Sequence, residues 1–388
     1  MSVTWARGFV AAGTASGIKP GGVADLALVA AVAGAVPAAA TFTTNRSCAA
    51  PVTVSRAHLA QSGGRAAAVI LNSGCANAAT GAAGLDAAER MAAAVAGPLG
   101  VAAREVLVCS TGLIGYELPI ELIEAAAPAL VGARGRSPDH AAAAATAILT
   151  TDSHPKQVTR DGGTFRVGGM AKGAGMIAPH MATMLAVLTT DAKATPEVLA
   201  ASLSQAVEGS FNALIVDGCT STNDTVVVLA SGEAGAPSPA DLTATLADAC
   251  ADLAYQLAAD AEGATRVVEV RVVGAASDAD ARLAARAVAG SLLVKVSLYG
   301  ADPYWGRIVS ELGASGAAFD PDRVRVSYGA TTVVEAGVGV AHDDKAAVAH
   351  LSGRDVEISC DLGLGTGTAS VLATDLGHGY VDENMRTS

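Results

Sequence analysis

Helical segments alternate with valine-rich segments along the whole chain, and this alternation limits the fold more than any other feature of the sequence. Two of the helices open on a capping residue followed by proline and an early acid, at Thr195-Pro196-Glu197 and Ser238-Pro239-Ala240-Asp241. The valine-rich runs are flanked by Gly, Asp or Asn, which is typical of strands. We therefore expect an α/β fold, with layered sheets in an α+β arrangement. The expected helices are 86–98, 119–132, 139–149, 196–208, 240–258 and one from after Ser277 to about Ala289; the expected strands are 67–72, 105–109, 184–189, 225–230, 266–273, 292–298 and 323–336.

A glycine-rich stretch interrupts the alternation. Residues 161–182 run DGGTFRVGGMAKGAGMIAPHMA, a composition typical of a linker. A shorter stretch, SGEAGAPSP at 231–239, has the same character. The clearest boundary is expected at 161–182, and a softer joint at 231–239.

The size and charge of the chain limit its architecture and partners. Its 388 residues exceed the roughly 250–300 at which a single core stops growing, so two domains or one two-lobed domain are expected. A net charge of −12 without a Lys/Arg run argues against nucleic acid or an anionic membrane as a partner. The first twenty residues do not resemble a secretory signal, and no apolar run approaches the ~18 residues of a membrane span. A cytoplasmic protein is expected.

The cysteines and histidines do not predict a metal site. Six cysteines are scattered without a C-x-x-C pair, which fits reduced thiols better than a disulfide framework or a zinc site. His342 with Asp343 and Asp344 is the nearest approach to a metal cluster, and a solvated turn explains it better. In GGMAKGAG, Lys172 precedes its glycine and a strand-like run follows, so the stretch does not match a nucleotide-binding P-loop.

The stretch KGAGMIAPHMATMLA at 172–186 places Thr183 where a loop becomes an apolar run. A threonine hydroxyl is a weak nucleophile and needs a nearby base, but no Ser-His-Asp or Cys-His order stands out to supply one. Cleavage of the Ala182–Thr183 bond would create an α-amino group with a pKa of about 7.7–8 next to that hydroxyl. The small preceding residue and the upstream glycines permit the strained geometry of an N-to-O acyl shift. A flexible glycine-rich hairpin is the alternative.

Acyl transfer also requires donors for an oxyanion. CSTGLIG at 109–115 follows an apolar strand and offers the Thr111 hydroxyl and the Gly112 N–H; a plain strand-to-loop turn is the other explanation. Further polar clusters border apolar elements, where side chains from a rigid scaffold converge. They are NSGCANAATG (72–81), TTDSHPK (150–156), DGCTSTND (217–224) and DAEGATR (260–266).

Together these motifs resemble the ornithine acetyltransferases of arginine biosynthesis, also called bifunctional glutamate N-acetyltransferases. The resemblance covers essentially the whole chain, and KGAGMIAPHMATML is its most specific motif. It also includes GFVAAGTASGIKPGGVADLALV near the start, FTTNRSCAAPV at 42–52, YGADPYWGRI at 299–308 and the terminal GYVDEN.

The resemblance implies self-cleavage into chains 1–182 and 183–388 that stay associated as an α2β2 unit or larger. Thr183 would take the acetyl group of N-acetylornithine and pass it to glutamate by a ping-pong route. No metal or cofactor is implied, and the use of acetyl-CoA as a second donor is left open.

The resemblance also implies the site residues. Thr111 and Gly112 correspond to the oxyanion pair, and the TTD motif leaves Thr150 and Thr151 open, with Thr151 favoured. A zwitterionic substrate needs a cation for its carboxylate and an anion for its ammonium group, roles that suit Lys172 and Glu262. The remaining substrate contacts fall on Thr183, Asn384 and the hydroxyl of Ser388.

Three other functions stay open. A related self-processing aminopeptidase would use the same exposed nucleophile to hydrolyse peptides, although such enzymes typically expose serine. A paralogue acetylating another acceptor would be consistent with Cys219 and Tyr304, which depart from the family pattern. The third is a non-enzymatic amino-acid-binding protein that remains one chain.

Overall fold

The computed structural model describes residues 2–178 and 184–385, which fall into two compact units. The first comprises the described residues of Met1–Ala174, His180–Asn212 and Cys219–Leu257, and the second those of Gly175–Pro179, Ala213–Gly218 and Ala258–Ser388. One change of unit, after Ala174, falls inside the predicted boundary 161–182. The predicted softer joint at 231–239 is wrong, because it lies within the first unit.

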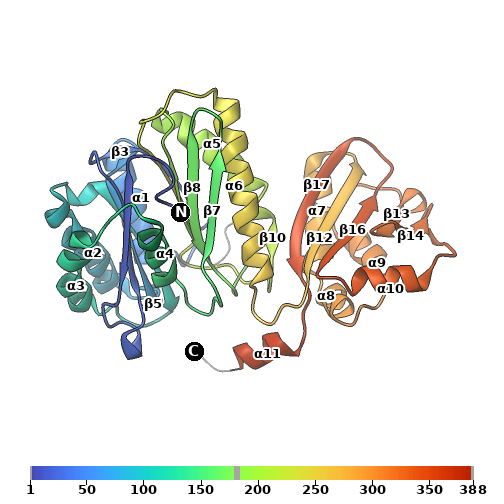
Figure 1. Cartoon of the computed structure of the whole chain (residues 1–388). Helices are drawn as coiled ribbons and strands as arrows, with labels where there is room; N and C mark the ends of the chain where they lie inside the picture. The colour runs from blue at the N-terminus through green and yellow to red at the C-terminus, as the bar shows by residue number, and fades with distance from the viewer. Residues whose placement is uncertain (1, 179–183, 386–388) are drawn as a thin grey trace. The chain divides into compact units, whose positions relative to one another are not determined.

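Two sheets packed face to face form the centre of the first unit (Figure 1). Their shared core takes Val29 and Leu71 from one sheet and Met170 and Val187 from the other. The four-stranded sheet has the order β1(Phe9–Thr14), β2(Leu26–Ala31), β5(Ala68–Cys75), β6(Val106–Leu113). The six-stranded sheet has the order β4(Arg65–Ala66), β3(Val36–Phe42), β11(Thr225–Ala230), β9(Leu185–Thr190), β8(Arg166–Lys172), β7(Lys156–Asp161).

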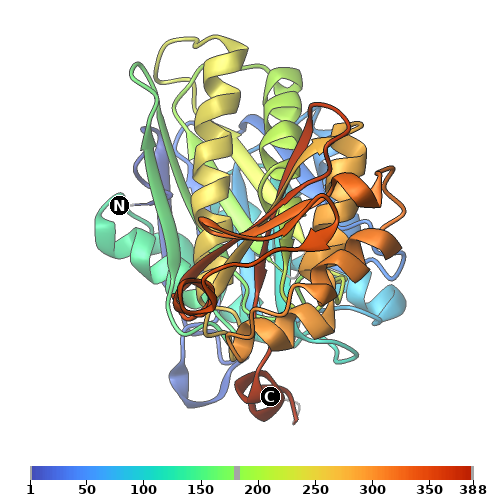
Figure 2. The same ribbon diagram turned by 90° about the vertical axis from the view of Figure 1, so that its right-hand side faces the viewer.

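Helices cover the outer faces of both sheets (Figures 1 and 2). The helices α1(Ala50–Gln61), α2(Gly81–Leu99) and α3(Ile120–Gly132) pack on the four-stranded sheet, and α4(Pro138–Ala147) lies beside β1. On the six-stranded sheet lie α5(Pro196–Glu208) and α6(Pro239–Ala259). The Thr243 hydroxyl of α6 donates to Ser202 Oγ of α5 at 2.8 Å, and Arg160 of β7 pairs with Asp248 and Asp252 of α6. The first unit is a four-layer α/β structure, which confirms the predicted fold class.

A single mixed sheet organises the second unit. Its order is β10(Leu214–Ile215), β17(Gly367–Thr374), β12(Val267–Ala275), β16(Asp355–Asp361), β13(Arg325–Tyr328), β14(Thr331–Glu335), β15(Val338–Gly339). Its helices are α7(Asp278–Gly290), α8(Leu292–Tyr299), α9(Gly306–Ala314), α10(Asp344–Leu351) and α11(His378–Asn384). No helix in the described part of the chain combines the length and apolar character needed to cross a membrane.

Most predicted elements are observed, and α5 and β11 have the predicted bounds. The strand predicted at 292–298 is wrong, because Leu292–Tyr299 is helix α8. The predicted linker 161–182 contains strand β8, which pairs with β7 and β9. The strand predicted at 323–336 is a hairpin of β13 and β14.

Candidate active site

The predicted oxyanion pair lies at the end of strand β6. Thr111 is 3% exposed, and Gly112 has a φ of +127°, a conformation that favours glycine. A Cβ at Gly112 would lie 2.3 Å from the carbonyl carbon of Gly74, the residue opposite it on β5. The backbones of the two strands therefore approach closely where Thr111 and the Gly112 N–H are held.

Lys172 contacts two other predicted site residues, Thr111 and Thr150. It is the last residue of β8 and only 2% exposed. Its ammonium group donates to Thr150 Oγ1 at 2.7 Å and to Thr111 Oγ1 at 3.2 Å. The structure thus brings together residues from CSTGLIG, TTDSHPK and the glycine-rich stretch. Thr151 is exposed.

Asp152, which the sequence analysis did not single out, completes this cluster. Its carboxylate accepts from Lys156 Nζ at 2.6 Å and from the Gly173 N–H at 2.6 Å, and its Oδ2 lies 3.8 Å from Lys172 Nζ. Burial acts to raise the pKa of Asp152, but the charges of Lys172 and Lys156 outweigh burial and lower the pKa to about 2. Two ammonium groups around one carboxylate leave one net positive charge. The cluster therefore suits an anionic ligand.

Lys19, which the sequence did not predict as a site residue, contacts the residue before Thr150. Lys19 Nζ donates to the carbonyl oxygen of Leu149 at 2.7 Å, and Leu149 precedes Thr150. The buried carboxylate of Asp25 holds the Lys19 backbone by accepting its N–H at 2.9 Å. Burial is the main cause that lowers the pKa of Lys19, and the charge of Lys172 adds to the effect.

Another buried carboxyl lies where β9 begins. Asp224 Oδ1 accepts the N–H of Met184 at 3.0 Å, and Asp224 is fully buried. Burial raises its pKa well above the ordinary value, although the Met184 N–H and the charge of Lys172 act in the opposite direction. The neighbouring Asn223 donates to the carbonyl oxygen of Ser110 at 3.0 Å. The start of β11 is thereby tied both to the start of β9 and to the end of β6.

In the second unit, the predicted residues Glu262 and Asn384 are in contact. Asn384 Nδ2 donates to Glu262 Oε2 at 2.8 Å and to the carbonyl oxygen of Tyr380 at 3.0 Å. A Cβ at Gly175 would lie 2.3 Å from Glu262 Oε2, so the Glu262 carboxylate lies close against the backbone of Gly175. The side-chain amide of Asn384 therefore holds the carboxylate of Glu262 in place.

The predicted residues Ala182, Thr183 and Ser388 lie outside the described residues. Within 2–178 and 184–385, no group of three or more His, Cys, Asp or Glu side chains is arranged to hold a metal ion. His342 Nε2 lies 3.0 Å from Asp344 Oδ1, and its Nδ1 lies 2.7 Å from the carbonyl oxygen of Val340.

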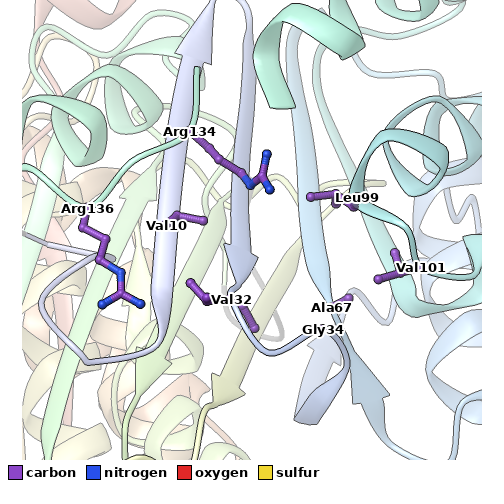
Figure 3. Close-up of a pocket in the computed structure, with 9 residues that line it drawn as sticks. Val10, Val32, Gly34, Ala67, Leu99, Val101, Arg134 and Arg136 are labelled. Atoms are coloured by element: carbon purple, nitrogen blue, oxygen red, sulfur yellow. The ribbon is translucent and has the colours of Figure 1, made fainter. Parts of the chain in front are cut away.

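A cavity of about 460 Å³ lies at the opposite end of the four-stranded sheet from Thr111 (Figure 3). Aliphatic side chains and two arginines line it, and Arg134 caps α3 by donating to the carbonyl oxygen of Val131 at 2.5 Å. No nucleophile, acid or base is among the lining residues, which include Val10, Val32, Leu99, Val101, Arg134 and Arg136. This cavity is separate from the cluster around Lys172, none of whose members line it.

Sequence comparisons match the same family over nearly the whole chain. The model of the ArgJ family matches residues 10–387. The arginine biosynthesis bifunctional protein ArgJ of Thermobifida fusca is 48% identical over 390 residues, covering 100% of both chains. The protein of the same name from Mycolicibacterium paratuberculosis is 49% identical over 393 residues, covering 100% of this chain and 96% of its own. The crystal structure of ornithine acetyltransferase complexed with ornithine from Mycobacterium tuberculosis matches with 46% identity and a TM-score of 0.44, covering 46% of this chain and 94% of that chain.

Proposed function

The chain belongs to the ArgJ family, and from this membership we propose that it transfers an acetyl group from N-acetylornithine to glutamate through an acetyl-Thr183 intermediate. It is an acetyltransferase of arginine biosynthesis. The observation that carries the detailed proposal is the contact of the buried Lys172 ammonium group with Thr150 and Thr111, because it joins a carboxylate-binding cation to an oxyanion donor.

The first reaction is self-cleavage. Thr183 Oγ attacks the carbonyl carbon of Ala182, the bond from that carbon to the Thr183 nitrogen breaks, and an ester forms. Water then hydrolyses the ester, which leaves a carboxylate on Ala182 and a free α-amino group on Thr183. That amino group is the base that the threonine hydroxyl lacks in the uncut chain.

The second reaction is acetyl transfer. Thr183 Oγ attacks the acetyl carbonyl of N-acetylornithine as its α-amino group takes the hydroxyl proton, and the tetrahedral intermediate expels ornithine, whose nitrogen receives that proton. The neutral amine of glutamate then attacks the acetyl ester and restores the Thr183 hydroxyl. Lys172 donates to Thr111 Oγ1, so the Thr111 proton is left to bind the oxyanion together with the Gly112 N–H.

Substrate recognition follows from charge. The net positive cluster of Lys172, Lys156 and Asp152 suits the α-carboxylate that both substrates carry, and Thr150 or Thr151 adds a hydroxyl donor. Glu262, held by Asn384, suits the side-chain ammonium of ornithine. Ser388 completes the set of proposed contacts.

The proposal includes an assembly and a second donor. Chains 1–182 and 183–388 remain together in the cytoplasm as an α2β2 unit or larger, and the reaction uses no metal or cofactor. The two relatives named above are called bifunctional, which supports acetyl-CoA as a second acetyl donor.

Intact mass of freshly purified protein under denaturing conditions tests the proposal. Two fragments meeting at Ala182 and Thr183 are expected, and the C-terminal fragment should gain one acetyl group from N-acetylornithine and lose it on addition of glutamate. Acetyl-CoA is tested as donor in the same way, and Thr183→Ala is the control that neither cleaves nor acetylates. A wild-type chain that stays whole and unacetylated would refute the proposal.

A further inference from the structure

Two aspartates of the motif DGCTSTND, at 217–224, accept backbone N–H groups on either side of the predicted cleavage bond. In the second unit, Asp217 Oδ2 accepts the N–H of Met176 at 2.6 Å, and its Oδ1 accepts the N–H of Ile177 at 3.0 Å. In the first unit, Asp224 Oδ1 accepts the N–H of Met184. Neither carboxylate has a role in the function proposed above.

The upstream contact holds a strained turn. Met176 has a φ of +57°, a backbone conformation that is strained for a non-glycine residue and persists only where the surroundings fix it. Asp217 supplies acceptors for two successive amides there, and the Val216 N–H donates to the carbonyl oxygen of Ile177 at 2.8 Å. The chain that enters the cleavage segment is therefore fixed by Asp217 and its neighbour.

The downstream contact is buried. Asp224 is fully buried, and its Oδ2 receives no hydrogen bond of ordinary geometry from the described residues, although the Ser221 side chain faces the carboxyl. Burying a carboxyl oxygen without a hydrogen bond lowers the stability of the folded state. The contact that it does make is with the Met184 nitrogen, to which Thr183 is joined by its peptide bond.

We propose that Asp217 and Asp224 are positioning residues for the reactions of Thr183, with separable effects. Asp217 acts in self-cleavage alone, and Asp224 acts in both self-cleavage and acetyl transfer. The two effects differ because cleavage separates Met176 and Ile177 from the chain that begins with Thr183. Met184, in contrast, remains bonded to Thr183. This inference rests on the proposed function.

The test follows two rates in the full-length protein. Cleavage is measured by intact mass from the moment of purification, and acetyl transfer to glutamate is measured per cleaved chain once cleavage is complete. Asp217→Ala is expected to slow cleavage at least tenfold, while transfer by its cleaved form stays within twofold of wild type.

Asp224→Ala is expected to slow both reactions at least tenfold, with a lower kcat and an unchanged KM for glutamate. Asp224→Asn keeps an acceptor for the Met184 N–H, so it should restore both rates to within about threefold of wild type.

Matched controls separate positioning from folding. Asp375 accepts the amides of Thr265 and Arg266 at 2.8 and 2.9 Å in the second unit, much as Asp217 does for Met176 and Ile177. Asp191 is buried just beyond the far end of β9 and accepts the Arg166 N–H at 2.7 Å. Asp375→Ala and Asp191→Ala should lower the melting temperature without changing either rate.

Each contrary outcome has a definite meaning. Wild-type rates in Asp217→Ala, slow transfer by its cleaved form, or an Asp224→Ala chain that loses only thermal stability would overturn the inference while leaving the proposed function intact. A wild-type chain that neither cleaves nor becomes acetylated would overturn both.

Discussion

At the residue scale, the charge balance around Asp152 decides what the cluster in the first unit binds. Lys156 and Asp152 are both fully buried and pair at 2.6 Å, and Lys172 lies on the other side of the carboxylate. Buried charges are tolerated when they are paired and hydrogen-bonded. Two ammonium groups, of Lys156 and Lys172, beside the one carboxylate of Asp152 give the cluster a net positive charge that would attract a carboxylate.

Replacing Asp152 with asparagine should destabilise the protein, because it leaves two buried ammonium groups without their anion. A loss of roughly 3–5 kcal/mol in the free energy of unfolding is expected from breaking such a pair. Urea unfolding at pH 7 measures the loss, and Asp241→Asn on the exposed start of α6 is a control expected to change little. A change below about 1 kcal/mol would contradict this account of the pair.

The same pair predicts a pH dependence. The pKa of Asp152 is about 2 in the folded chain and near 3.8 in the unfolded chain, so the folded state favours the ionised form. A lowered carboxyl pKa stabilises the fold above the unfolded value, and this contribution is lost as the pH falls through the folded value. The stability difference between wild type and Asp152→Asn should therefore shrink between about pH 4 and pH 2. A constant difference over that range would contradict the prediction.

Gly112→Ala should impair acetyl transfer, because the added Cβ meets the Gly74 backbone and the φ of +127° is strained for alanine. Losing one oxyanion donor typically costs about 10²–10³ in kcat. Gly115→Ala is the matched control, since Gly115 also has a positive φ, of +87°, but open space where its Cβ would be. Steady-state kinetics of the two variants should differ by at least tenfold in kcat.

The sequence predicted Thr111, Thr150 and Lys172 as site residues, but not the groups that hold them. Asp152 and Lys156 lie inside the flagged TTDSHPK cluster, and Asp224 lies inside DGCTSTND. The sequence did not reveal that these side chains are buried. An Asp and a Lys four residues apart are typical of a solvated loop, but in the structure they lie buried beside β7 and β8. The resemblance predicted the site residues, and the fold shows which groups contact Thr111, Thr150 and Lys172.

At the element scale, two of the wrong predictions, those for α8 and β8, have different causes. Helix α8 was predicted as a strand because LLVKVSL is apolar except for Lys295 and Ser297, and so short a run does not reveal its period. Strand β8 was predicted as part of a linker because of its paired glycines. A Cβ at Gly168 would lie 1.9 Å from the carbonyl oxygen of Ser2, and one at Gly169 would lie 2.6 Å from Leu188, so close packing rather than flexibility explains these glycines.

Ser291→Ala should weaken helix α8. The Ser291 hydroxyl accepts the Val294 N–H at 3.4 Å as the helix cap and donates to Glu311 of α9 at 2.9 Å. Loss of such a cap costs about 0.5–2 kcal/mol, to be measured by denaturant unfolding. Ser352→Ala, which removes an exposed hydroxyl after α10, is the control. Equal stability of the two variants would argue against the capping role.

At the scale of the whole molecule, the six-stranded sheet joins the two predicted chains. Strands β9 and β11 come from 183–388 and lie between β3 and β8, which come from 1–182. Backbone hydrogen bonds therefore bind the later strands to the earlier ones on both sides. Cleavage between Ala182 and Thr183 would break none of these strand pairs.

The cleaved chains should consequently stay together without denaturant. Size-exclusion chromatography of fully cleaved protein is expected to give one peak containing both fragments, and only a denaturant should separate them. Thr183→Ala, the uncut chain, supplies the reference elution volume. Fragments that separate in native buffer would contradict the interleaved sheet.

Because of the interleaved order of β3, β11, β9 and β8, the proposed self-cleavage would be a one-way change in how the protein can fold. In the uncut chain, the short link from Lys172 on β8 to Leu185 on β9 holds these strands at an effective concentration in the millimolar range, so the hairpin closes as a unimolecular event. Once that link is cut, the same pairing is a meeting of two separate molecules, and its rate depends on protein concentration. The precursor should refold after dilution from denaturant at any concentration, whereas the mature protein should lose that ability as it is diluted.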